Sequence, residues 1–281
     1  MGLIEVKNTG TVRIASDMSV TPNTSISTYG IDWVASFYQN QILINQLKNK
    51  RYTSGPNQGH LVYEVEFDNN LNQSFFKILN SLDGGNPANY RFNQFHYEDI
   101  DKISAFIAYI IATFKLETGG IRSNNLYSPV REAYYLGVGS QSWLKYLRSK
   151  AGIYRGPVYP TNHPYSGVPI FYGRGLTELT HQDNYDKLND VLKAKIPNFS
   201  FDLLTDPDSV LEFDISMAVS VEGMLDGLFT GLSLKKVWKK FSNDTQTFFY
   251  ECRPIINSYD QAELIAFYAM DFYKVMVVKE L

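Results

Sequence analysis

Two acidic residues, Glu117 and Glu132, are spaced so that they could act as a catalytic pair. Glu117 directly follows a segment with helical apolar periodicity, residues 101–116, and precedes Thr118-Gly119-Gly120. A carboxyl at the exit of a buried helix lies where core meets cleft, and apolar neighbours such as Leu116 would raise its pKa, as a general acid requires. The plainer alternative is a solvated glutamate in the last turn of a helix.

Glu132 is the second candidate, and it lies in residues 129–133 (PVREA) beside Arg131. A neighbouring guanidinium should keep a carboxylate ionised, which is the state that a general base needs. Glu132 follows Glu117 by 15 positions (132 − 117), which is compatible with two sides of one cleft joined by a loop. The pair therefore suggests acid and base catalysis, with no cofactor.

Several further segments downstream carry polar and glycine residues in a specific order. In residues 171–175 (FYGRG), Gly173 and Gly175 flank Arg174, which predicts a close backbone approach at that point. Arg174 could equally form a structural ion pair. The segments in question are residues 117–120 (ETGG), 129–133 (PVREA), 171–175 (FYGRG), 179–180 (LT), 184–185 (NY), 222–224 (EGM), 229–231 (FTG) and 253–257 (RPIIN).

Taken in this order, these segments resemble the family 19 chitinases and the related phage endolysins over about residues 70–281. The resemblance implies that Glu117 is the general acid, that Glu132 is the base that activates water, and that Thr180 helps to position that water. It further implies an inverting mechanism, for which the two carboxyls must lie roughly 6.5–9.5 Å apart. The residues that it implies in substrate binding are Tyr172, Arg174, Glu178, Asn184 and Asn257.

The sequence departs from the family pattern at four places. Leu116 stands where a histidine usually precedes the acid, and residues 121–128 form a longer loop than in the compact phage members. Glu178 replaces the usual glutamine, and His181 replaces the usual tryptophan. Glu178 therefore adds a carboxyl that either raises the pKa of a neighbouring acid or lies outside the cleft.

The periodicity predicts a mainly α fold. Helices are expected at residues 101–116, at 206–225 after the Asp206-Pro207 start signal, and at 260–278, with a surface loop at 150–170. The resemblance implies a lysozyme-like, bilobal catalytic domain over residues 70–281. Residues 1–69 form a small N-terminal α+β segment with strands at 11–15 and 61–68 and a helix at 31–48. This segment is either a docking module or an elaboration packed on the core.

Composition excludes several classes of function. The net charge of −3 offers no basic field for nucleic acid, and no apolar stretch is long enough for membrane insertion. The single cysteine, Cys252, rules out an internal disulfide, and the four scattered histidines show no metal-ligand spacing. No signal peptide is visible at the start.

The sequence thus predicts an inverting glycosidase of the lysozyme or chitinase type that cleaves β-1,4 bonds of peptidoglycan or chitin. Peptidoglycan is preferred because the match resembles the phage type, an argument by analogy. Delivery to the cell wall would need a holin, a virion or an injection particle. The N-terminal segment could bind the virion or the injection particle. The alternative is a catalytically silent glycan-binding or structural component of such a particle. An immunity or toxin-partner role has no support beyond the unexplained N-terminus.

Overall fold

The computed structural model describes residues 5–7, 11–13, 78, 100–118, 127–196 and 199–276. Strands β1 (Glu5–Lys7) and β2 (Thr11–Arg13) pair antiparallel, and β2 lies within the strand predicted at residues 11–15. The strand predicted at 61–68, the helix predicted at 31–48 and the domain boundary at 69/70 lie outside the described residues.

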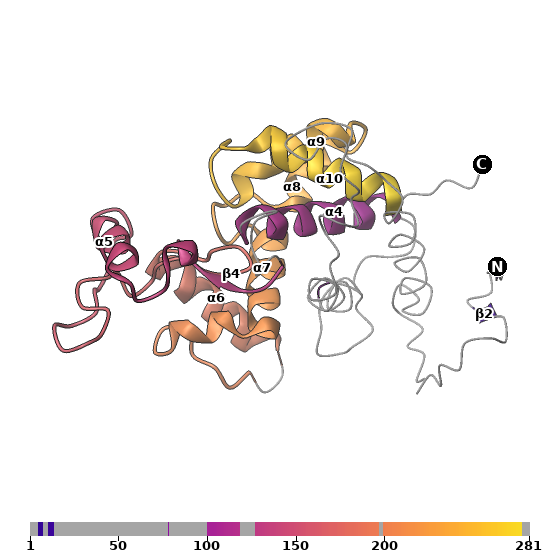
Figure 1. The fold of residues 1–281 in the computed structure, drawn as a ribbon. Coiled ribbons are helices and arrows are strands. Elements are labelled where there is room, and N and C mark those ends of the chain that lie inside the picture. Colours follow the sequence, from indigo (N-terminus) through magenta and orange to yellow (C-terminus); the bar gives the residue numbers. More distant parts are fainter. Residues whose placement is uncertain are drawn as a thin grey trace.

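The described part of the chain is mainly helical, as the sequence predicts, and its strands are short (Figure 1). After β2 the elements are α4 (Ile100–Glu117), β3 (Val130–Arg131), η4 (Tyr134–Leu136), α5 (Gln141–Ser149), β4 (Arg174–Gly175), α6 (Gln182–Lys195), η5 (Pro207–Leu211), α7 (Phe213–Asp226), α8 (Leu234–Phe241), α9 (Thr245–Cys252), η6 (Arg253–Ile255) and α10 (Ala262–Met276).

The largest core lies around α4, which packs chiefly against α10 and also against α9 and α7 (Figure 1). The apolar positions that predict α4 are its buried face: Phe106, Ile110 and Phe114 are fully covered. The helix ends at Glu117. After it, the Thr118 hydroxyl donates a hydrogen bond to the Phe114 carbonyl of the last turn at 2.6 Å. The core therefore fixes where Glu117 emerges.

Helix α7 joins this core to a second one. Every residue from Ile215 to Leu225 is buried, so the helix is covered on all sides, and its buried polar residues are Ser216, Ser220 and Glu222. Met217 and Val221 belong to the α4 core, whereas Ala218 and Val219 pack with α6 and the segment around Leu179. One helix therefore supports both parts of the described chain.

The sequence predicts a single helix over residues 206–225, and this is wrong in one respect. Pro207–Leu211 is a short 3₁₀ helix, Glu212 is extended with ψ 131°, and α7 begins only at Phe213. The Asp206 side chain makes no cap hydrogen bond. This separate 3₁₀ helix places Asp208 beside Arg131 and Arg174, with which it forms ion pairs.

The final helix and the loop at 150–170 follow the prediction more closely. Helix α10 occupies residues 262–276 of the predicted 260–278. Residues 150–170 contain no helix, and a single antiparallel bridge joins Val158 to Pro169. Within the described residues, no helix has the length and apolarity needed to cross a bilayer.

Candidate functional site

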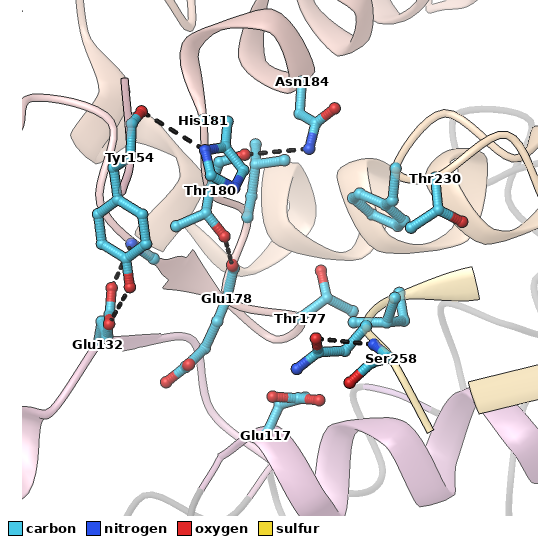
Figure 2. Close-up of a pocket in the computed structure, with 15 residues that line it drawn as sticks. Glu117, Glu132, Tyr154, Thr177, Glu178, Thr180, His181, Asn184, Thr230 and Ser258 are labelled. Atoms are coloured by element: carbon cyan, nitrogen blue, oxygen red, sulfur yellow. Dashed lines mark hydrogen bonds between the residues drawn. The ribbon is translucent and has the colours of Figure 1, made fainter. Parts of the chain in front are cut away.

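A pocket of about 590 Å³ lies between the end of α4, the segment after β3, the turn after β4 and the loop after η6 (Figure 2). Six of the eight predicted site residues line it, and Tyr172 and Arg174 do not. Its lining comprises Glu117, Glu132, Tyr154, Gly173, Thr177, Glu178, Leu179, Thr180, His181, Asn184, Phe229, Thr230, Ile256, Asn257 and Ser258. The sequence thus predicts a set of residues that the fold brings together from distant positions.

Glu117 occupies one wall of the pocket, at the end of α4 (Figure 2). Its side chain is only 14% exposed, and its Oε1 accepts a hydrogen bond from Arg253 Nη1 at 2.6 Å. Burial raises the pKa of Glu117 above its usual value, and the charge and hydrogen bond of Arg253 act in the opposite direction. Burial therefore tunes this carboxyl toward the protonated form, and Arg253 limits the effect.

Arg253 is itself held firmly at the start of η6. Its side chain is 3% exposed, and its Nε donates to the Asp260 carbonyl at 2.8 Å. The sequence places Arg253 in a motif but assigns it no role. Because it contacts Glu117 from a position 136 residues away, only the fold shows the pairing.

Glu132 occupies the opposite side of the pocket, where three donors hold its carboxyl (Figure 2). Oε2 accepts from the Gly173 backbone N–H at 3.0 Å, and Oε1 accepts from the hydroxyls of Tyr146, at 3.2 Å, and Tyr154. A group surrounded by donors is in the setting of a carboxylate, which only accepts hydrogen bonds. Neither tyrosine was predicted, because they come from α5 and the irregular loop after it.

The predicted role of Arg131 beside Glu132 is wrong. Arg131 donates instead to both carboxylate oxygens of Asp208, at 2.8 and 2.6 Å, and to the Tyr172 hydroxyl. Arg131 is the last residue of β3 and Glu132 lies in the turn after it, and the two side chains have different partners: Asp208 for Arg131, and Gly173 N–H and two tyrosines for Glu132. Arg131 is not part of the pocket lining, and its ion pair joins β3 to η5.

Arg174 and Tyr172 belong to the same supporting network and not to the pocket lining. Arg174 is fully buried, pairs with Asp208 at 2.7 Å, and lies over the Tyr172 ring at 3.6 Å from its centroid. Partial burial acts to raise the pKa of Asp208, but the two arginines lower it below its usual value. The structural ion pair considered for Arg174 is therefore the arrangement found, and both residues act on Glu132 only through the backbone that they support.

A tight turn between Arg174 and Leu179 carries Glu178 into the pocket. The two residues exchange backbone hydrogen bonds at 3.2 and 2.8 Å, and Glu178 has a left-handed φ of 48°. Gly175 has φ +89°, and a Cβ there would lie 2.6 Å from Ser216 Oγ, so the predicted close approach is present. Figure 2 shows the Glu178 side chain reaching between Glu132 and Glu117.

The sequence left open whether Glu178 lies inside or outside the cleft, and the structure places it inside. Burial raises its pKa well above the usual range, and the negative charges of Glu117 and Glu132 add to this effect. The carboxyl whose pKa the neighbours raise is therefore Glu178 itself. The pocket contains three acidic side chains, and its lining includes no lysine or arginine among the described residues.

The remaining predicted residues form a polar rim. Thr180 Oγ1 donates to the Glu178 carbonyl at 3.0 Å, and Asn184 Nδ2 donates to the Thr180 carbonyl at 3.1 Å. Asn257 lies across the pocket and accepts from the Ser258 N–H at 2.8 Å. Hydroxyl and amide groups on both sides suit a ligand that is rich in hydroxyls and amides.

The sequence matches no protein-family model and no curated protein, and the structure matches no solved structure. In the described part of the chain, no group of three His, Cys, Asp or Glu side chains is arranged to hold a metal ion.

Proposed function

We propose that this protein is an inverting glycoside hydrolase that cleaves β-1,4 bonds between N-acetylated aminosugars. The observation that carries the proposal is the position of Glu117 and Glu132 on opposite sides of one pocket, whose lining also includes hydroxyl and amide groups. Two carboxyls in different environments are the means by which such enzymes separate an acid from a base. The resemblance described above supports the same assignment.

In the proposed reaction, Glu117 donates its proton to the glycosidic oxygen while the bond from that oxygen to the sugar C1 breaks. Burial, which raises the pKa of Glu117, supports its role as the acid. Glu132 accepts a proton from a water molecule, whose oxygen bonds to C1 on the opposite face of the sugar. Thr180 helps to position this water, and Asn184 and Asn257 bind the sugar from either side.

Peptidoglycan is the preferred substrate in this proposal, and chitin is the second. The preference rests on the resemblance to phage enzymes. The same analogy proposes a lysozyme-like, bilobal fold for residues 70–281 and a docking role for residues 1–69 on a virion or injection particle. A holin would be the other route to the cell wall.

The decisive test compares Glu117→Gln with wild-type protein in clearance of purified peptidoglycan and in release of reducing ends from peptidoglycan and chitin. We expect the variant to lose about 10²- to 10⁴-fold in rate, because an amide has no proton to transfer. Glu212→Gln is the matched control, since Glu212 is exposed and makes no cap hydrogen bond. An unchanged rate in Glu117→Gln would refute the proposal.

A second candidate is a catalytically silent glycan-binding module, and one contact favours it. The 2.6 Å ion pair with Arg253 favours the ionised form of Glu117, which is the wrong form for an acid. Sedimentation with insoluble peptidoglycan and chitin, run beside the reducing-end assay, separates the two functions. Binding without new reducing ends would support the silent module.

A further inference from the structure

Glu178 differs from the other two acids of the pocket in having no partner. Glu117 has Arg253, and Glu132 has two tyrosine hydroxyls and a backbone N–H. In the described part of the chain, no hydrogen bond or ion pair reaches the Glu178 carboxyl. A carboxyl on the lining of a pocket that the protein leaves unpartnered is placed to meet a ligand.

The position of Glu178 is fixed by the surrounding backbone. Leu176 N–H donates to Ser216 Oγ at 2.7 Å, and Thr177 Oγ1 lies 3.1 Å from Ser220 Oγ, so hydrogen bonds join the turn to α7 at two points. A left-handed φ at a residue other than glycine costs free energy and persists only where neighbouring contacts enforce it. The carboxyl is therefore held between Glu117 and Glu132 (Figure 2).

Charge decides which form of Glu178 this position favours. Three carboxylates beside one guanidinium, already bound to Glu117, would place uncompensated negative charge in a confined space. Taking up one proton relieves this repulsion, and the acid without donors holds that proton at least cost. The titratable groups around Glu178 are Glu117 on α4, Glu132 after β3, Tyr146 on α5, Tyr154 in the following loop, Arg253 on η6 and His181.

We propose that Glu178 binds the glycan as a neutral carboxylic acid and donates a hydrogen bond to a sugar hydroxyl or acetamido oxygen. A neutral carboxyl has an O–H donor, whereas a carboxylate can only accept. The direction of its pKa, raised by burial and then by the two neighbouring acids, agrees with this state. The identity of the ligand rests on the proposed function.

Binding to a soluble probe, chitotetraose, tests the proposal in the Glu117→Gln background, where the catalytic acid no longer titrates or cleaves. Calorimetric titration from acid to alkaline pH should show affinity falling as Glu178 loses its proton, which it does at a lower pH than in wild-type protein because Glu117→Gln removes one neighbouring negative charge. The Glu117→Gln/Glu178→Gln protein should lose this pH dependence, because an amide remains a donor at every pH. Glu117→Gln/Glu178→Ala should bind about tenfold more weakly than the glutamine variant.

Glu117→Gln/Glu212→Gln is the control and should match Glu117→Gln at each pH. An affinity that does not depend on pH in the Glu117→Gln background would overturn the proposal. So would a glutamine variant that binds no better than the alanine variant, because that result means that the carboxylate is the binding form.

Infrared spectroscopy of the protein without ligand tests the protonated state separately. The carbonyl absorption of a protonated carboxylic acid should be present at neutral pH and should weaken in Glu178→Gln, and an identical spectrum would overturn the proposal. If the absorption is present but neither chitotetraose nor sedimented peptidoglycan binds, the proposed function has failed and the glycan role of Glu178 fails with it. If glycan binds without pH dependence, only this inference fails.

Discussion

The two walls that carry Glu117 and Glu132 are built in different ways. Glu117 ends a long helix whose apolar face is buried against α10, and a single buried arginine contacts its carboxyl. Glu132 follows a two-residue strand, and side chains from α5 and an irregular loop hold it. One wall relies on burial of apolar surface, and the other relies on hydrogen bonds and ion pairs between residues far apart in sequence.

This difference suggests how the site divides its tasks. Burial in an apolar setting favours the neutral form of a carboxyl. Several hydrogen-bond donors around a carboxyl favour the ionised form, which only accepts hydrogen bonds. The helical wall therefore suits proton donation, and the polar wall suits proton acceptance. The comparison also predicts that the two walls respond differently to substitution.

The largest expected effect is on activity, from Glu132→Gln. The amide cannot accept a proton from water, so we expect a loss of about 10²- to 10⁴-fold in reducing-end release. The variant should still sediment with insoluble glycan. Glutamine keeps one acceptor oxygen for the tyrosines, so circular dichroism should show an unaltered fold, and wild-type activity would remove Glu132 from the mechanism.

Arg174→Met should produce the largest loss of stability. The guanidinium is fully buried and donates to Asp208, to the carbonyls of Ile170 and Tyr172, and to two tyrosine hydroxyls. Asp208 would keep Arg131 as a partner, but the carbonyls and hydroxyls would lose a buried donor, and each group left unsatisfied costs about 1–3 kcal/mol of unfolding free energy. Chemical denaturation measures this loss.

Arg131→Met is the matched comparison within the same network. Its side chain is 20% exposed, whereas that of Arg174 is fully buried. Among the described residues, the Arg131 guanidinium donates only to Asp208 and the Tyr172 hydroxyl. The loss should therefore be smaller than for Arg174→Met. Equal losses for the two variants would contradict the idea that burial makes the Arg174 contacts the main support of this wall.

The contrast between the walls also describes what the sequence could predict. The 3.6-residue apolar period of residues 101–116 is local information, and it predicted α4 and the position of Glu117. The two tyrosine partners of Glu132 lie 14 and 22 residues further along the chain, on α5 and in the irregular loop after it, and no local pattern indicated them. The role of Arg131 was predicted wrongly because adjacency in sequence was taken as contact in space, whereas its partner Asp208 lies 77 residues further along the chain.

Arg253→Met should change the pH dependence of activity more than the fold. Arg253 lowers the pKa of Glu117, in opposition to burial, so its removal should raise that pKa further. Activity requires protonated Glu117, and its decline at high pH should therefore move upward by about one pH unit. A profile of kcat/KM against pH measures the shift, and a downward movement would contradict the assignment of Glu117 as the acid.

The smallest effect that we predict is on stability, from Glu178→Gln, and its size depends on pH. Because the folded-state pKa of Glu178 is raised above the unfolded value, the folded protein keeps a proton that the unfolded chain releases. Stability contributed by this group is present below the unfolded pKa and is lost as pH rises toward the folded one. Glutamine does not ionise, so the variant does not lose this stability as pH rises. The Tm difference in favour of Glu178→Gln should therefore be absent in acid and grow toward alkaline pH. The exposed Glu212→Gln variant should show no such trend, and a Tm advantage for Glu178→Gln that is largest in acid would mean that the folded site holds Glu178 as a carboxylate.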